Sequence, residues 1–462
     1  MSFLFPRISR IGLAPLFFSV LAANLAFSSL QSAHAAPVQA RKADDFVDSI
    51  GVDLHVYDYD DAASWSAIKA HLGGLGVRYY RDGLEHVDNP TRKAHFRDLY
   101  DTYGMKMLAV CGPYGNDSLQ PDATGSLSHV ADKIAAIKPF TLAVEGPNEP
   151  EFFWFDGWKF GGFSDRPGQV VWYQNKLYDT IKGDARTRDV PVTTFATARP
   201  ETYSNYFSNK PLVKHDIFAW HYYNGRYLPT PYDWIARGRD YLGSDAATKP
   251  AYLTEHGYRI RGDGSVTPKA QMKLNTRSLA FFFNWDNYNN QKVFFYVAGK
   301  DSAAGEDYGL ANADLSPRPV YNSMKSVLSY FKEATWNSAT KTWKKPVFTP
   351  GSLDYTVSGD AGDYGWRLTQ KSGGDFYLMA LPYNQIANPG DGTDYPSPTH
   401  NVTLTFAASQ KVAQYKVDET SGNYVETPLT PGATSVNIAL SDALVIFKIS
   451  PASVPPTAPK AR

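Results

Sequence analysis

The sequence predicts an α/β protein in which a (β/α)8 TIM barrel is followed by a C-terminal antiparallel β-sandwich. Between about residues 50 and 331, short β-rich runs alternate with helix-like stretches, as parallel strands joined by crossover helices do. Eight such pairs fit the roughly 250 or more residues of a TIM barrel. After about Glu333 the pattern changes to short alternating segments separated by Gly, Pro, Asn and Asp clusters, which is typical of a sandwich.

Each expected barrel element has its own pattern. The strands are rich in Val, Ile, Phe or Tyr, as buried strands are, and are expected at residues 50–54, 77–81, 107–111, 142–146, 192–196, 217–221, 251–255 and 293–297. Helical spacing of apolar residues predicts core-facing helix stripes at Trp65, Ile68, Leu72 and Leu75, and at Val320, Met324, Val327, Leu328 and Phe331.

An open doubly wound sheet is the alternative to the barrel. That fold would favour a glycine-rich phosphate turn after the first strand. The sequence there is His55-Val56-Tyr57-Asp58, which contains no glycine. The barrel is therefore preferred, with expected domain limits of 46–333 for the barrel, 334–450 for the sandwich and 451–462 for a flexible, Pro- and Ala-rich tail. The sandwich is expected to brace the barrel rather than to bind sugar.

Residues 1–36 are expected to be a cleaved signal peptide. Arg7 and Arg10 precede an apolar run over residues 11–30, and Ala33-His34-Ala35 fits a cleavage site. This predicts a secreted or periplasmic protein with no membrane contact after cleavage. A retained membrane anchor is the alternative, although Pro15 and Asn24 interrupt the run.

Composition excludes several classes of protein. Lys+Arg and Asp+Glu both total 46, so there is no basic excess to bind nucleic acid. Aromatic residues make up 14%, which excludes intrinsic disorder and suits sugar binding. The single cysteine, Cys111, allows no intramolecular disulfide and is expected to be a small buried residue at a strand end. The oligomeric state is not readable from these numbers.

Two glutamates follow apolar strands where a barrel places its active site, at the carboxyl ends of the strands. Glu149 comes after the fourth expected strand, in Gly146-Pro147-Asn148-Glu149-Pro150, and Glu255 ends the seventh. Two carboxyl groups facing each other across the mouth of a barrel can cleave a glycosidic bond, one as an acid and the other as a nucleophile or base. Their separation decides between retention and inversion of the anomeric centre.

These motifs resemble those of clan A, the large clan of retaining (β/α)8 glycoside hydrolases, and most closely family thirty-nine and related bacterial polysaccharide hydrolases. The resemblance implies that Glu149 is the acid/base, that Glu255 is the nucleophile and that Asn148 binds the substrate 2-hydroxyl group. His221 and Tyr223 match the His-x-Tyr element after the sixth strand, whose tyrosine orients the nucleophile. Arg81, at the end of the second strand, matches a basic residue that keeps the nucleophile ionised.

The end of the eighth expected strand departs from this pattern. Many members of the clan have a tryptophan there, under the reacting sugar, whereas this chain has Tyr296 or Phe295 to serve instead. Further candidates for contact with sugar are Trp154 and Trp158, from the aromatic segment after Glu149, together with His55 and His256. For these four residues, packing outside the site is an equally good interpretation.

The predicted function is an exported retaining glycoside hydrolase that acts on an oligo- or polysaccharide, with an exopolysaccharide included. It needs no cofactor or metal, and the acidic loops at 301–307 and 390–394 lack full calcium-loop spacing. A non-catalytic carbohydrate-binding barrel and a transglycosylase with the same residues are the alternatives. The sugar, the linkage and endo or exo action are not predictable from the sequence.

Overall fold

The computed structural model describes residues 37–113, 117–153, 160–198, 203–207, 212–228, 248–283, 289–301, 305–360, 364–429 and 432–452. The predicted signal segment, Trp154, Trp158 and most of the predicted tail lie outside these residues. In the described part of the chain, no helix combines the length and the apolar character that crossing a membrane requires.

Seven parallel strands form the barrel sheet, in the order β6-β5-β4-β3-β9-β8-β7. Almost all of their residues are buried, which explains why these segments are apolar on both faces. The strands are β3 (Ile50–Asp53), β4 (Tyr79–Gly83), β5 (Lys106–Val110), β6 (Thr141–Glu145), β7 (Phe218–Tyr222), β8 (Ala251–His256) and β9 (Asn290–Phe295).

The expected strand at 192–196 is present only as isolated bridges, but it lies in the gap between β6 and β7. Val192 pairs with Val144 of β6, and Thr193 pairs with Ile217 just before β7. The Thr194 hydroxyl accepts a hydrogen bond of 2.9 Å from the Ala219 N–H, so a side chain here replaces part of the backbone ladder. The segment closes the ring as the eighth member, and the predicted TIM barrel is confirmed.

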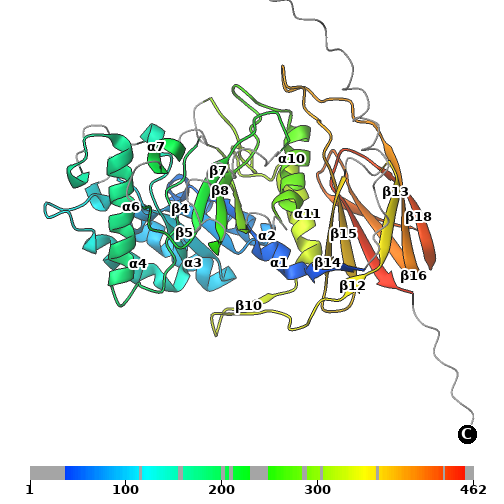
Figure 1. Ribbon diagram of the computed structural model, residues 1–462, viewed down its shortest axis with the longest axis horizontal. Helices are drawn as coiled ribbons and strands as arrows, with labels where there is room; N and C mark the ends of the chain where they lie inside the picture. The colour runs from blue at the N-terminus through cyan, green and yellow to red at the C-terminus, as the bar shows by residue number, and fades with distance from the viewer. Residues whose placement is uncertain are drawn as a thin grey trace, which may run out of the picture.

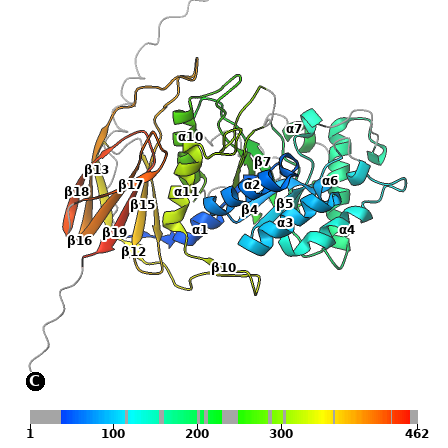
Figure 2. The same ribbon diagram turned by 180° about the vertical axis from the view of Figure 1, so that it is seen from behind.

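Helices cover the outside of the barrel, with α2 and α3 on one side and α10 and α11 on the side that faces the C-terminal sheet (Figures 1 and 2). Both predicted helix stripes are buried, in α2 and in α11. The helices described are α1 (Ala43–Asp48), α2 (Ala62–Leu75), α3 (Pro90–Tyr103), α4 (Ser128–Ile137), α5 (Pro150–Phe153), α6 (Arg166–Gly183), α7 (Tyr203–Phe207), α10 (Pro268–Phe282) and α11 (Pro319–Phe331).

Local sequence explains where these helices begin and end. Asp61 caps α2 by accepting hydrogen bonds from the backbone N–H groups of Ala63 and Ser64, and Asn89 caps α3 with Pro90 in the first turn. Gly76 and Gly104 end the same two helices in the left-handed conformation, which a residue without a Cβ adopts at little cost.

The C-terminal domain is an antiparallel β-sandwich, as predicted, and the long strand β16 contributes to both of its layers. The first half of β16 pairs with β13 and β18, and the second half pairs with β17 and β19, with a register shift between Thr405 and Gln410. Such an irregularity lets a strand bend from one layer into the other. The larger strands are β13 (Tyr355–Gly359), β14 (Tyr364–Gln370), β15 (Phe376–Pro382), β16 (His400–Val417), β17 (Tyr424–Pro428), β18 (Ala433–Leu440) and β19 (Val445–Pro451).

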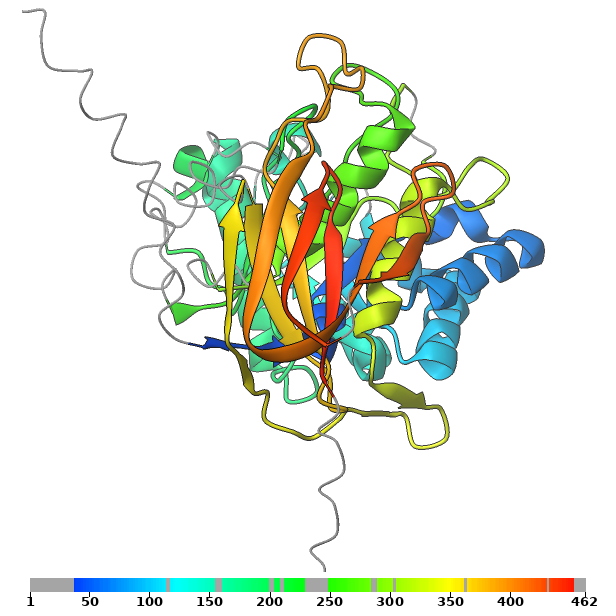
Figure 3. The ribbon, with the colours of Figure 1, turned by 90° about the vertical axis from the view of Figure 1, so that its right-hand side faces the viewer.

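The interior of the sandwich is a hydrophobic core of its own, and the outer face of one of its layers packs into the core of the barrel helices. On β15, Leu378 and Ala380 face the interior of the sandwich, whereas Tyr377, Met379 and Leu381 belong to the core cluster that includes the barrel helices. This alternation has the period of two that a strand buried on both faces requires. Figure 3, which looks from the sandwich side, shows the sandwich strands lying across α10 and α11.

Short strands before the barrel also belong to the C-terminal half of the fold. β1 (Val38–Gln39) pairs with β12 (Ser352–Leu353), and β2 (Arg41–Lys42) pairs in parallel with β14. A hairpin of β10 (Thr335–Asn337) and β11 (Thr342–Lys344) lies between barrel and sandwich in the sequence. Neither pairing of β1 or β2 was predicted, because both join segments that are more than 300 residues apart in the sequence.

Cys111 is buried at the end of β5, as expected. Its Sγ lies 3.5 Å from the Tyr173 hydroxyl, and burial raises the pKa of the thiol to about 12. A thiol that stays protonated is a poor nucleophile, so Cys111 has the properties of a packing residue.

Candidate active site

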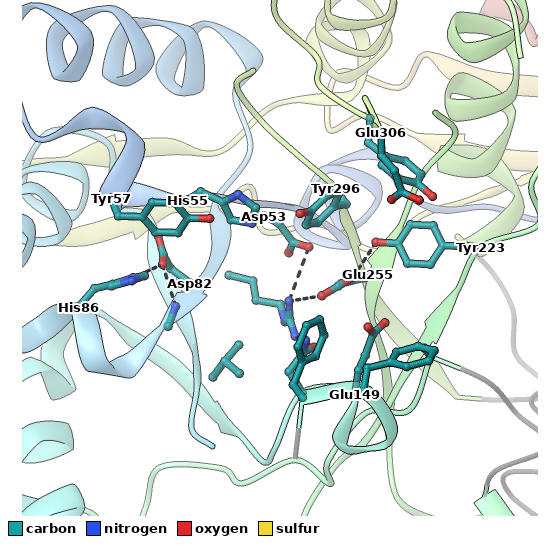
Figure 4. A pocket seen from close by; sticks show the side chains of 18 of the residues that line it. Asp53, His55, Tyr57, Asp82, His86, Glu149, Tyr223, Glu255, Tyr296 and Glu306 are labelled. Atoms are coloured by element: carbon teal, nitrogen blue, oxygen red, sulfur yellow. Dashed lines mark hydrogen bonds and ion pairs between the residues drawn. The ribbon is translucent and has the colours of Figure 1, made fainter. Parts of the chain in front are cut away.

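A pocket of about 730 Å³ opens at the carboxyl ends of the barrel strands. Its lining comes from residues that end or follow β3, β4, β6, β7, β8 and β9, so distant parts of the sequence converge on it. Glu149 and Glu255 both line this pocket, and Figure 4 shows them near each other, with Tyr223 and Tyr296 close to Glu255.

Glu149 has an unusual backbone conformation at the exit of β6. Its φ is 37°, in the left-handed region that residues with a side chain rarely adopt. The neighbouring chain holds this conformation, because the Glu149 N–H donates to Ala196 O at 2.7 Å and the Glu149 carbonyl accepts from the N–H groups of Phe152 and Phe153. Backbone strain of this kind is concentrated at functional sites.

His221 lies between the two glutamates. Its Nδ1 is 2.8 Å from Oε1 of Glu149 and 3.6 Å from Oε2 of Glu255. One oxygen of each glutamate and a ring nitrogen of His221 all lie within 4.8 Å of one another. Burial lowers the pKa of His221, but the carboxylates of Glu255 and Glu149 raise it by more, so it lies above its ordinary value.

Glu255 accepts hydrogen bonds on both oxygens. Arg81 Nη1 donates to Oε1 at 2.6 Å, and the Tyr223 hydroxyl donates to Oε2 at 2.6 Å. Burial raises the pKa of Glu255, but His221, Arg81 and Tyr223 together hold it below its ordinary value. The carboxylate is therefore ionised and oriented, with both of its supporting side chains on strand ends of the barrel.

Arg81 connects several parts of the site. Its Nε and Nη2 donate to the two oxygens of Glu145 at 3.1 and 2.8 Å, and Nη2 also donates to Oδ1 of Asn148 at 2.7 Å. The bidentate contact fixes the plane of the guanidinium. With Oδ1 of Asn148 turned toward Arg81, the Nδ2 group of Asn148 is the end that can donate to a ligand in the pocket.

Among the other predicted site residues, Tyr296 and His55 line the pocket. The Tyr296 ring lies 5.6 Å from that of Tyr308 and 5.2 Å from that of His55, so an aromatic wall forms beside Glu255. Phe295 is buried and packs against His256, with ring centroids 5.6 Å apart, and does not reach the pocket lining.

His256 lies behind the site rather than in it. It is fully buried, with Nδ1 2.8 Å from the Tyr222 carbonyl and Nε2 2.8 Å from the Ser278 hydroxyl. Burial lowers its pKa to about 4, so the ring is neutral at ordinary pH. Of the two interpretations of His256 that the sequence allowed, its position agrees with packing outside the site and not with contact with sugar.

Several pocket residues were not found from the sequence. Asp53, at the end of β3, and Asp82, on β4, line the pocket, whereas Glu145, at the end of β6, is buried behind it against Arg81. Asp82 accepts hydrogen bonds from the Val56 N–H at 2.9 Å and from His86 Nδ1, when that nitrogen is protonated, at 2.7 Å. The sequence signal that could have identified these residues is an acidic residue at the end of an apolar run. The same signal led to the prediction of Glu149 and Glu255.

Within the described ranges, Glu149, His221 and Glu255 are also the group whose ligand atoms are close enough together to hold a metal ion. Carboxylate and imidazole groups are suitable ligands for several divalent metals. The prediction that the chemistry uses no metal or cofactor stays a prediction.

The fold is that of the clan A glycoside hydrolases, so the predicted resemblance is confirmed at the level of fold. Similar solved structures include a glucosidase from Croceicoccus marinus (13% identity, 90% of this chain and 97% of that chain, TM-score 0.55). Another is the GH39 enzyme from Xanthomonas axonopodis pv. citri (13% identity, 90% of this chain and 98% of that chain, TM-score 0.53). A third is a monomeric β-xylosidase from Caulobacter crescentus CB15 (15% identity, 90% of this chain and 98% of that chain, TM-score 0.55). Neither a family model nor a curated protein matches the chain.

Proposed function

We propose that this protein is an exported retaining glycoside hydrolase that cleaves O-glycosidic bonds in an oligo- or polysaccharide. The observation that carries the proposal is the pair of carboxyl groups in the pocket, with one oxygen of Glu149 and one of Glu255 less than 4.8 Å apart. Retaining glycosidases have carboxyl groups about 5–5.5 Å apart, whereas inverting enzymes need about 6.5–9.5 Å to admit a water molecule. The short separation favours double displacement.

The environments of the two glutamates support different roles. Glu255 is buried and has its pKa lowered by surrounding donors, which suits a nucleophile that must be ionised. Glu149 lines the pocket, is half-buried and contacts His221, so it can exchange protons with a leaving group and then with water. In the first step Glu255 attacks the anomeric carbon while Glu149 protonates the departing oxygen; in the second, Glu149 removes a proton from the water that releases the sugar.

The pocket surroundings support a substrate with a sugar on each side of the scissile bond. Phe152 and Phe153 lie three and four residues after Glu149, line the pocket and are 52% and 54% exposed. Sugar rings present apolar C–H faces that stack on aromatic side chains, so these residues are placed to hold the leaving-group side. A glucosidase and a β-xylosidase are among the similar structures, so glucosides and β-xylosides are the first substrates to test.

The experiment is product release from β-linked polysaccharides and aryl β-glycosides by the wild type, Glu255→Ala and Glu149→Ala. We expect turnover by the wild type and a loss of several orders of magnitude in both variants. Glu426→Ala, on the exposed face of β17, is the matched control and should keep wild-type activity. Wild-type levels of turnover in Glu255→Ala would contradict the proposal, as would a wild type that binds a polysaccharide and releases no product from it.

Azide distinguishes the two glutamates. On an aryl glycoside with a good leaving group, azide should restore turnover to Glu149→Ala and yield a glycosyl azide of retained configuration, because azide attacks the glycosyl-enzyme without a general base. Transfer of sugar to an acceptor sugar in place of water, seen as longer products, would identify a transglycosylase with the same residues.

A further inference from the structure

Asp53 is a buried carboxyl group that lines the pocket without a hydrogen-bond donor in the described part of the chain. Its side chain is 2% exposed, it lines the pocket, and neither Oδ1 nor Oδ2 has a hydrogen-bond partner among the described residues. Its nearest cation is Arg81, whose Nη1 lies 3.7 Å away and is already bonded to Glu255. Buried carboxylates almost always have partners, so this one needs an explanation.

The charge around Asp53 makes its position costly to the folded protein. Burial raises the pKa of Asp53; Arg81 opposes this, and the neighbouring Glu255 and Glu145 add to the rise, so its pKa lies well above the ordinary value. Three carboxyl groups thus compete for one guanidinium. These properties are expected of a carboxyl group whose hydrogen bonds are supplied by a bound ligand.

His55 gives a second, similar observation from the same strand end. Its Nδ1 is buried and has no hydrogen-bond partner within the ranges that the structure describes, and its ring lines the pocket between Tyr57 and Tyr296. Figure 4 shows Asp53 and His55 on the side of Glu255 opposite to Glu149. Because Glu149 protonates the leaving oxygen in the proposed function, the Asp53 side of the pocket holds the sugar that Glu255 attacks.

We propose that Asp53 is a specificity-determining residue that accepts hydrogen bonds from hydroxyl groups of the attacked sugar, remote from the leaving group, with His55 beside it as a second contact. A carboxyl group with two free acceptor oxygens matches adjacent sugar hydroxyls, which are both donors. The inference rests on the proposed function, since it assigns the sugar side of the same pocket. It predicts selection against sugars that are deoxygenated at the contacted position.

The first test uses the aryl β-glycoside that the wild type hydrolyses and its 3-deoxy, 4-deoxy and, for a hexoside, 6-deoxy analogues. Loss of a contacted hydroxyl should lower wild-type kcat/KM about 10- to 100-fold, the effect of one hydrogen bond to a charged group. Asp53→Ala should lower kcat/KM on the parent glycoside by a similar factor. On the analogue that lacks the contacted hydroxyl, the variant should have nearly the same kcat/KM as it has on the parent glycoside. An equal loss on every glycoside would overturn the proposal, because it would show that Asp53 acts only through Arg81 or Glu255.

A second test needs no substrate. Asp53→Asn should leave Tm unchanged or raise it at pH 7, because the substitution removes a buried ionisable group that has no hydrogen-bond partner among the described residues. The control is Asp44→Asn, since Asp44 is equally buried but binds Arg78 and the N–H groups of Glu333 and Ala334, and its Tm should fall. A comparable fall for Asp53→Asn would assign it a structural role and overturn the inference. A wild type without glycosidase activity would overturn the proposed function alone, since this Tm comparison would still be decided.

Discussion

Arg81 on β4 and Glu255 on β8 meet in the barrel interior, with Nη1 of the arginine 2.6 Å from Oε1 of the glutamate. The same guanidinium holds Glu145 of β6 through two hydrogen bonds. One cation thus ties together the ends of three strands and sets the charge of the residue proposed to attack the sugar. Its planar fork of donors makes all of these contacts at once.

Arg81→Lys should damage both stability and catalysis. A lysine ammonium is a point charge that cannot hold Glu145, Asn148 and Glu255 in their present geometry, so at least one buried carboxylate loses its partner. We expect the free energy of unfolding, measured by urea denaturation, to fall by about 3–5 kcal/mol and kcat/KM to fall at least about 100-fold. Unchanged stability would show that Glu145 finds another partner.

Tyr223→Phe should shift the acid side of the pH profile upward. Donation from the Tyr223 hydroxyl helps to lower the pKa of Glu255, so removing it raises that pKa and protonates the nucleophile at a higher pH. The acidic limb of kcat/KM against pH should move up, with a loss at the optimum of about 10- to 100-fold. A lower activity with an unmoved acidic limb would assign the hydroxyl group to substrate binding instead.

His221→Asn should destabilise the protein more at pH 5.5 than at pH 8.5. The pKa of His221 is raised above its ordinary value of 6.5, so its stabilising contribution is complete below that value and is lost as the pH rises through the folded-state pKa. Glu255 behaves in the opposite sense, because its lowered pKa adds stability above its ordinary value of 4.5. Urea unfolding of wild type and variant at both pH values measures the difference, and an equal loss at both would exclude a charged His221.

Lys273→Met should weaken the attachment of the sandwich to the barrel. Lys273 on α10 is buried and its Nζ contacts both oxygens of Asp442 in the sandwich at 2.8 and 2.9 Å. Removing the lysine leaves Asp442 without this cation, at a cost of about 3–5 kcal/mol in the free energy of unfolding. Lys269→Met is the control, since Lys269 is exposed and its ion pair with Glu419 should be worth about 0–1 kcal/mol. Equal effects of the two substitutions would contradict the prediction.

Much of the fold could be predicted because apolar, β-branched strands and helix stripes carry local signals. The segment at 192–196 shows the limit, since it occupies the place of a strand but forms only isolated bridges, and a threonine side chain replaces part of the ladder. That exchange depends on Ala219 of the neighbouring strand, which no local pattern specifies. The pairing of β2 with β14 could not be predicted either, because it joins two short segments that are more than 300 residues apart in the sequence.

In the candidate site too, features with a local sequence signal could be predicted and features that depend on long-range contacts could not. Glu149 and Glu255 could be selected because each carboxylate follows an apolar strand at the active-site end of a barrel. Glu145 and Asp53 have similar signals, but their importance comes from their distances to Arg81, and a sequence contains no distances. For His256, the sequence could not distinguish a pocket residue from a packing residue, since the direction of the side chain depends on the register of β8 with its neighbours.

The pairing of β2 with β14 has a consequence for biosynthesis. A ribosome releases residues 41–42 long before residues 364–370, so this parallel pair cannot form until the chain has been made through β14. Until then the first strands of the nascent polypeptide have exposed edges, which favour pairing with other chains. A chaperone that keeps the chain unfolded until synthesis is complete would therefore protect this protein more than one whose sandwich is built from a single continuous stretch.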